Sequence, residues 1–240
     1  MIETVLFSGL AGLITIAGVL MVRIWHRYAL RYSHFINSFA AGLILTAGTT
    51  VLFPRAIERL DHQAGLYVVG GFALFLILET LLVFHSGAEF HYGSRTRARG
   101  MVFFWGLFLH SLLDGVVIAI GFATSFDLGI LTSVAVISHE LPEGITTFSL
   151  LLDKLQGRTA LWLAVAVALA TPIGGIVGAV LLTQVSGHFM GAAIAVVAGS
   201  FLYIAATDIV PEIREEKAGR SIACMILGMI FLALIHHFLH

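Results

Sequence analysis

Charged residues are scarce in this sequence. Of its 240 residues, 11% are Asp, Glu, Lys or Arg and 59% are hydrophobic, and the mean hydropathy is +0.99. Soluble domains carry about 25% charged residues. The composition therefore excludes an ordinary water-soluble protein and indicates one whose solvent is lipid.

Other absences narrow the possibilities further. Cys224 is the single cysteine, which excludes a disulfide framework within the chain. The sequence has no basic patch of the kind that binds nucleic acid, so we expect no nucleic-acid partner. It also has no linker and no low-complexity segment, and we expect residues 1–240 to form a single transmembrane domain.

Long apolar runs dominate what is present. A bilayer core is about 30 Å thick and requires about 20 apolar residues in a helix that crosses it. We therefore expect an all-α integral membrane protein with about eight spans. The first run reads as a retained helix, since its basic residues follow it, whereas a signal peptide has them in front. The expected spans are 4–24, 35–53, 65–85, 101–123, 128–152, 159–182, 188–211 and 221–239.

The basic residues indicate an orientation. Cytoplasmic segments next to membrane spans are rich in Lys and Arg. All 13 Lys and Arg residues except Arg55 and Arg59 lie in alternate gaps or, for Arg23, at the edge of one, at the ends of the first, third, fifth and seventh expected spans. We therefore expect a multi-pass protein of the cell (inner) membrane with both termini outside the cytoplasm. These basic residues are Arg23, Arg27, Arg31, Arg95, Arg97, Arg99, Lys154, Arg158, Arg214, Lys217 and Arg220.

Ionisable residues concentrate in the fourth and fifth expected spans. An ionisable group at the bilayer centre costs at least about 2.5–3.5 kcal/mol, so such groups usually face a cavity and have a function. At about 100° per residue, each His shares a helix face with a carboxylate four positions on. The residues are His110, Ser111 and Asp114 in the motif HSLLDG, and His139, Glu140 and Glu143 in the motif HELPEG.

These side chains suit a divalent metal ion. Two imidazoles with two or three carboxylates form a plausible ligand set for zinc, iron(II) or manganese, whereas copper(I) favours Cys or Met. Apart from Arg23 at the end of the first, no Lys or Arg lies in the expected spans to neutralise Asp114, Glu140 and Glu143, so these carboxylates must remain partly protonated or hold a cation. The alternative is a buried hydrogen-bonded network that only makes the helix bundle rigid.

The same motifs resemble those of a known transporter family. His110-Ser-Leu-Leu-Asp114-Gly and His139-Glu-Leu-Pro-Glu143-Gly resemble the fourth-helix and fifth-helix signatures of the ZIP family of zinc- and iron-regulated transporter-like proteins. The segment AGSFLYIAATDIVPE at 198–212 is similar to its seventh helix. The expected span number and orientation also match, so the resemblance covers the whole chain.

The resemblance implies a transporter and not an enzyme. It implies movement of zinc, or alternatively of iron(II), manganese or cadmium, into the cytoplasm, with no organic cofactor and with the metal site between the fourth and fifth helices. It also implies a homodimer and an elevator-like motion of one helix group against the other. Position by position, it puts forward His110, Asp114, His139 and Glu143 as ligands first, and Ser111 and Glu140 next.

The sequence departs from the family pattern in two places. Many members have Asn where Ser111 stands, and some carry an acidic residue in the sixth span that completes a second metal site. Span 159–182 contains no Asp, Glu or His, so we expect a single site. The loop after the third span is short, and its His85, Glu89 and His91 either receive metal or are simply solvated.

Three more carboxylates lie in or near the expected spans. Glu79 belongs to the third span and Asp208 to the seventh, and Glu212 lies at the cytoplasmic end of the seventh. They line an acidic exit route, or they cap helices and form hydrogen bonds.

An intramembrane zinc metalloprotease is the competing function. HELPE differs from the protease motif HExxH at one ligand, and Leu113-Asp114-Gly115 resembles the LDG motif of site-2 proteases. In that chemistry Glu140 would act as base on metal-bound water. However, Glu143 replaces the second His, and the two motifs follow one another in the reverse order and at short separation.

Overall fold

The computed structural model describes residues 1–84, 97–182, 185–212 and 218–239. These residues form a bundle of helices and contain no β-strand, which confirms the all-α prediction. A π-helical turn, Ala47–Leu52, precedes α2, and a 3-10 turn, Asp61–Gln63, follows it. The helices are α1 (Ile2–Thr46), α2 (Phe53–Leu60), α3 (Ala64–Phe84), α4 (Arg97–Thr124), α5 (Phe126–Lys154), α6 (Gly157–Leu181), α7 (Gly187–Glu212) and α8 (Ala218–Leu239).

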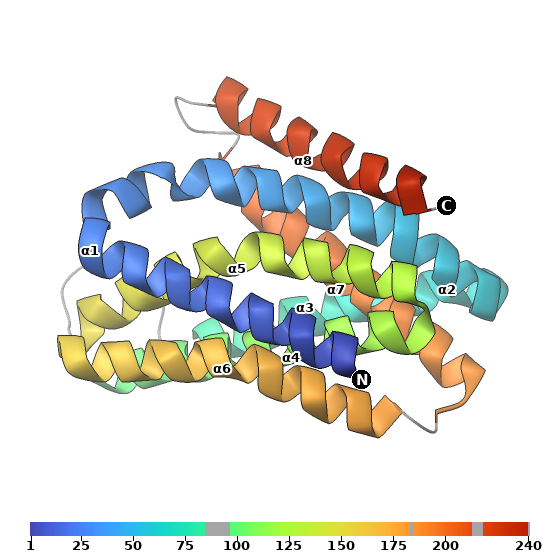
Figure 1. Cartoon of the computed structure of the whole chain (residues 1–240), viewed down its shortest axis with the longest axis horizontal. Helices are drawn as coiled ribbons and strands as arrows, with labels where there is room; N and C mark the ends of the chain where they lie inside the picture. The colour runs from blue at the N-terminus through green and yellow to red at the C-terminus, as the bar shows by residue number, and fades with distance from the viewer. Residues whose placement is uncertain (85–96, 183–184, 213–217, 240) are drawn as a thin grey trace.

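Helix α1 folds back on itself. It has helical backbone angles except at Trp25, where φ is −130° and ψ is 49°. Figure 1 shows the chain reversing near this point, so that α1 has an N-terminal arm (2–24) and a C-terminal arm (26–46). The sequence predicts two separate spans here, 4–24 and 35–53, but the residues between them also take up helical structure.

Several helices are suited to a bilayer by length and composition. Among the described residues, five stretches qualify, and α5, which carries HELPEG, is not one of them. Exposed apolar side chains cover their outer faces, as on α6, where Trp162 and Leu181 are both more than 60% exposed. The five stretches are Ile2–Leu78, Phe103–Thr124, Gly157–Leu181, Gly187–Ala206 and Gly219–Leu239.

Pairs of glycines bring the helices into backbone contact. In each pair, a Cβ added to either glycine would overlap a carbonyl oxygen of the other helix, so only glycine permits this approach. In lipid, such packing replaces the hydrophobic effect as the force that holds helices together. The pairs are Gly18 with Gly144 (α1 and α5), Gly115 with Gly174 (α4 and α6), Gly71 with Gly199 (α3 and α7) and Gly42 with Gly228 (α1 and α8).

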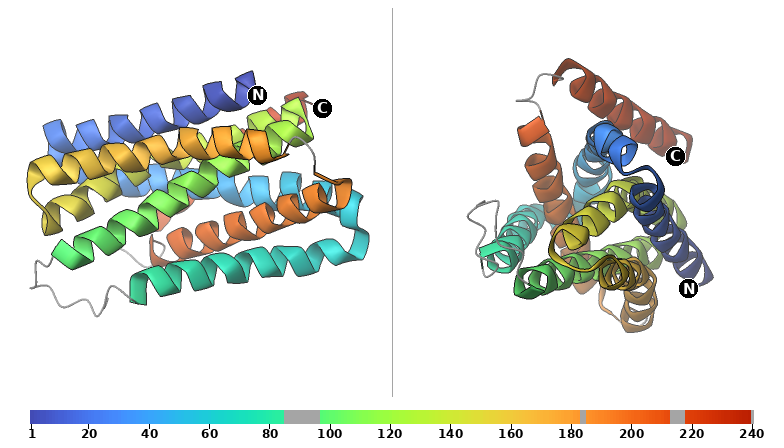
Figure 2. Two further views of the ribbon diagram at one scale, coloured as in Figure 1. Left: turned by 90° about the horizontal axis from the view of Figure 1, so that it is seen from below. Right: turned by 90° about the vertical axis from the view of Figure 1, so that its left-hand side faces the viewer.

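Helix α5 runs through the middle of the bundle. It packs against both arms of α1 and against α4, α6 and α8, and Figure 2 shows it surrounded by other helices. The Ser125 side chain caps its first turn by accepting a hydrogen bond from the backbone N–H of Leu128 at 3.1 Å. Pro142 lies inside α5, which remains helical on both sides of it. This central position lets α5 present polar side chains to several neighbours at once.

Candidate metal centre

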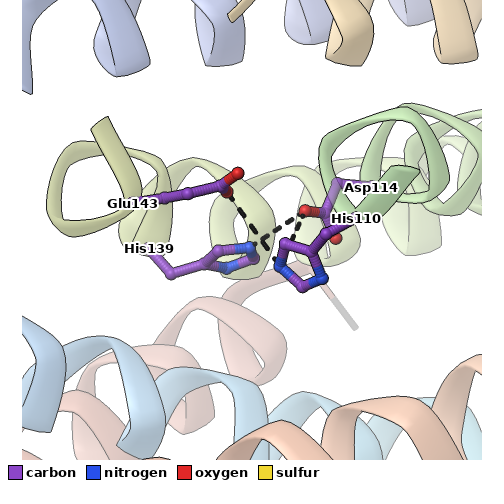
Figure 3. A group of neighbouring side chains, drawn as sticks. All are labelled: His110, Asp114, His139 and Glu143. Atoms are coloured by element: carbon purple, nitrogen blue, oxygen red, sulfur yellow. Dashed lines mark hydrogen bonds and ion pairs between the residues drawn. The ribbon is translucent and has the colours of Figure 1, made fainter. Parts of the chain in front are cut away.

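Helices α4 and α5 form a hairpin that turns at Ser125. This hairpin places the two motifs side by side, because both lie near the middle of their helices. Figure 3 shows that His110 and Asp114 from α4 and His139 and Glu143 from α5 point toward one another. One ligand atom from each of these four side chains lies within 4.8 Å of the others. Within the described part of the chain, no other group of three or more His, Cys, Asp or Glu side chains comes together in this way.

Two distances in this group match a metal site without rearrangement. Asp114 Oδ2 lies 3.4 Å from His110 Nε2 and 3.3 Å from His139 Nε2. Ligand atoms about 2.0–2.1 Å from a tetrahedral zinc ion are about 3.3–3.4 Å from one another. A third distance is wider, since His110 Nε2 lies 4.0 Å from Glu143 Oε2.

The hydrogen bonding of His139 presents a lone pair to Asp114. His139 Nδ1 lies 3.2 Å from the carbonyl oxygen of Ala135, which can only accept a hydrogen bond, so Nδ1 carries hydrogen. In the neutral ring, Nε2 then holds a lone pair that faces Asp114 Oδ2 at 3.3 Å. Two lone pairs at this distance require a proton or a cation between them. Metal-binding histidines typically donate their second ring N–H to a carbonyl or carboxylate in this manner.

One carboxyl oxygen of Glu143 accepts a hydrogen bond, and the other has no hydrogen-bond partner among the described residues. Ser111 donates a hydrogen bond to Glu143 Oε1 at 2.5 Å. Glu143 Oε2 is buried and has no hydrogen-bond partner among the described residues. Most buried polar atoms in a network that serves only rigidity have a partner. The unsatisfied Oε2, in the group with the two imidazoles, therefore favours a bound cation over such a network.

The group is buried except at one side chain. The side chains of Asp114, His139 and Glu143 are 4%, 9% and 7% exposed, whereas that of His110 is 28% exposed. His110 lies on the side of Asp114 that is nearer Arg97, the first residue of α4. On the other side, toward Ser125, the hairpin packs tightly, and Ile118 and Leu128 are almost fully buried. His110 is therefore the one member of the group that reaches the protein surface.

Ser111 and Glu140, the other two predicted ligands, lie outside the group of four. Ser111 is fully buried and contacts it through Glu143. Glu140 is also fully buried, but its carboxyl oxygens accept hydrogen bonds from Thr15 on α1 and Thr171 on α6. Their role as metal ligands stays a prediction.

Thr15 and Thr171 are contacts that the sequence did not reveal. Each is an ordinary-looking Thr in an apolar helix, and Thr15 lies 125 positions from Glu140. The sequence carries no signal that would connect them. The candidate loop ligands His85, Glu89 and His91 lie outside the described residues, as do the side chains of Glu79, Asp208 and Glu212.

The glycines of the two motifs contact helices. A Cβ on Gly115 would overlap the Thr171 carbonyl oxygen on α6, and a Cβ on Gly144 would overlap the Thr15 carbonyl oxygen on α1. Gly115 directly follows Asp114, and Gly144 directly follows Glu143. Close packing therefore fixes the backbone next to one proposed ligand on each helix.

Comparison with known proteins agrees with the family resemblance of the two motifs. The family model for the ZIP zinc transporter matches residues 85–236, more than half of the chain. Zinc transporter ZIP13 of Pongo abelii is 30% identical over 162 residues, which is 65% of this chain and 47% of that protein. Zinc transporter zipt-7.1 of Caenorhabditis briggsae is 27% identical over 146 residues, which is 52% of this chain and 36% of that protein.

A shorter match has higher identity. Zinc transporter ZIP4 of Homo sapiens is 39% identical over 113 residues, which is 47% of this chain and 17% of that protein. The matched part of this chain thus spans less than half the length of each of these relatives.

Proposed function

The chain belongs to the ZIP zinc transporter family, and from this we propose that it carries a divalent metal ion, zinc above all, across the membrane into the cytoplasm, with His110, Asp114, His139 and Glu143 as ligands. The observation that carries this proposal is the convergence of the four side chains in the α4–α5 hairpin. The match confirms the resemblance predicted from the sequence. The chain is a multi-pass membrane protein, and since ZIP proteins are transporters, the protease alternative is not favoured.

The chemistry of the ligands supports zinc as the transported ion. Two imidazole nitrogens and two carboxylate oxygens suit a borderline ion in a tetrahedral site. The named relatives are zinc transporters. Iron(II), manganese and cadmium are further candidates, because the same atoms bind them with a different preference.

The topology is part of the proposal. The kink at Trp25 divides α1 into two arms, and we count these arms, α3, α4, α5, α6, α7 and α8 as eight spans. Helix α5 joins the count because its neighbours shield its acidic residues from lipid. The positive-inside rule then places both termini outside the cytoplasm and the Arg97 and Lys154 ends of the hairpin inside. A homodimer in the cell (inner) membrane completes the proposal.

The burial of the site supports release toward the cytoplasm. His110, the partly exposed ligand, lies on the side of the site that the basic residues assign to the cytoplasm. The tightly packed side toward Ser125 then faces outward. In this conformation an ion leaves past His110, and loading from outside requires a rearrangement.

Metal uptake into proteoliposomes tests the proposal. Purified protein should transport zinc, and His110→Ala and Glu143→Ala should each reduce the flux at least about tenfold because a ligand is lost. His62→Ala, at an 84% exposed side chain away from the hairpin, is the matched control and should leave the flux unchanged. Normal flux in both ligand variants would end the proposal.

A further inference from the structure

We infer that Glu140 is a positioning residue that ties α5 to the N-terminal arm of α1 and to α6, and so holds His139 and Glu143 in place opposite α4. The inference rests on the proposed function, because the residues it positions are the proposed ligands. It differs from the prediction that Glu140 itself binds the metal.

Both carboxyl oxygens of Glu140 are engaged with neighbouring helices. Thr15 on α1 donates a hydrogen bond to Oε2, which it shares with the Ala11 carbonyl oxygen of its own helix at 3.1 Å, and Thr171 on α6 donates one to Oε1 at 3.1 Å. Glu140, Thr15 and Thr171 are all 0% exposed. Each bond is therefore shielded from water. A buried hydrogen bond to a carboxyl group is strong, and its loss destabilises the protein because the carboxyl oxygen is left without a partner.

The two hydrogen bonds that Glu140 accepts, which together form the tie, lie where the helix backbones are in contact. Thr15 donates its hydroxyl to Glu140, and its carbonyl oxygen contacts Gly144, four residues further along α5. Thr171 likewise donates its hydroxyl to Glu140, and its carbonyl oxygen contacts Gly115 on α4. A slide of α5 along α1 would break the hydrogen bond from Thr15 and force Gly144 away from its contact, and a slide along α6 would break the hydrogen bond from Thr171. Glu140 thus sets the register of α5 at this crossing.

The tie and the proposed ligands occupy neighbouring strips of α5. Glu140 is about 100° around the helix from His139 and about 60° from Glu143. His139 and Glu143 extend to α4, whereas Glu140 extends to α1 and α6. Because the side chains leave the helix in different directions, fixing Glu140 limits the rotation of α5 that would separate His139 from Asp114.

Thermal unfolding of the detergent-purified chain tests the tie without metal. Thr15→Val and Thr171→Val should each lower Tm by about 2–4 °C, the shift expected for one ordinary hydrogen bond in a chain of this size. Thr46→Val is the matched control: Thr46 is also buried in α1, and among the described residues its hydroxyl donates only to the Gly42 carbonyl oxygen of its own helix, a bond equivalent to the one from Thr15 to Ala11. The effects of Glu140→Ala and Thr15→Val should be non-additive, because both remove the same bond.

Zinc affinity of the same variants, measured by competition with a chromophoric chelator, separates a tie from a ligand. If Glu140 is a positioning residue, Glu140→Gln should bind zinc like the parent chain. The glutamine amide can accept a hydrogen bond from one threonine hydroxyl and donate a hydrogen bond to the other. The double variant Thr15→Val/Thr171→Val then weakens binding by about threefold or more. For a ligand, Glu140→Gln weakens zinc binding at least about tenfold and the double variant has no effect, which would overturn the inference.

Additive melting effects of Glu140→Ala and Thr15→Val would also overturn it. If Glu140→Ala does not fold, the zinc affinities of Glu140→Gln and of the threonine variants still show whether Glu140 is a positioning residue or a ligand. Failure of the proposed function is distinguishable, because the parent chain would then bind no zinc while the melting measurements still report on the tie.

Discussion

Asp114 Oδ2 lies 3.3 Å from Nε2 of His139, a nitrogen whose ring partner Nδ1 faces the carbonyl oxygen of Ala135. This pair joins α4 to α5 at the centre of the proposed metal site. It also brings an anionic oxygen and a ring lone pair together on two helices that carry no Lys or Arg between residues 101 and 153. A divalent ion resolves this conflict because both atoms can bind it.

Replacement of Asp114 tests this relationship. Asp114→Asn keeps the side-chain shape but removes the charge that faces both imidazoles, so zinc affinity should fall at least about tenfold. Competition with a chromophoric chelator in detergent measures the change. Asp127→Asn, in the first turn of α5 and away from the group of four, should bind zinc like the parent chain. Equal affinity in the two variants would exclude Asp114 as a ligand.

Metal preference should depend on the histidines. His110→Asp replaces a borderline nitrogen by a hard oxygen, which favours manganese over zinc. We expect the ratio of manganese to zinc uptake to rise at least about fivefold in proteoliposomes, with zinc uptake itself reduced. His188→Asp, at an exposed position of α7, is the control. An unchanged ratio in His110→Asp would show that His110 does not contact the ion.

The orientation can be tested by labelling single cysteines. In a Cys224→Ala background, a membrane-impermeant maleimide should label His62→Cys on intact cells and Asp153→Cys only after permeabilisation. Both positions are accessible, since the His62 and Asp153 side chains are 84% and 60% exposed. The reverse pattern would place both termini in the cytoplasm and contradict the proposed direction of transport.

Two adjacent glycines of α3 test the packing of the bundle. A Cβ on Gly71 would overlap the Val196 carbonyl oxygen on α7, whereas a Cβ on Gly70 has nothing within 4 Å. Gly71→Ala should lower the free energy of unfolding by about 1–3 kcal/mol through overpacking. Gly70→Ala should be neutral or slightly stabilising, because Ala favours a helix. Equal melting temperatures in the two variants would show that α3 and α7 do not pack as described.

Much of the architecture and of the site could be predicted because it depends on local patterns. Apolar composition indicates helices in lipid, and the four-residue spacing puts His110 with Asp114, and His139 with Glu143, on one face of each helix. The short link at Ser125 then makes the two helices neighbours. These local facts suffice to predict the group of four side chains that the structure brings together. The number of membrane spans stays a prediction, as does metal binding by any of the six predicted residues.

The surroundings of Glu140 could not be predicted. The sequence places it one position from His139 and therefore beside the same site, but its contacts depend on which helices pack against that strip of α5. Those helices carry Thr15 and Thr171, which are distant in the chain and unremarkable in sequence. Likewise, the chain between the first two expected spans is helical and bends at a single non-helical residue, Trp25. No local pattern of turn residues predicts this kink.

A crystal structure of the zinc-loaded protein, with anomalous diffraction recorded at the zinc absorption edge, tests the central claim most directly. The account predicts one strong peak in the α4–α5 hairpin, about 2.0–2.2 Å from Nε2 of His110, Nε2 of His139 and an oxygen each of Asp114 and Glu143. A zinc ion held elsewhere in the bundle, with these four side chains bonded only to one another, would contradict it.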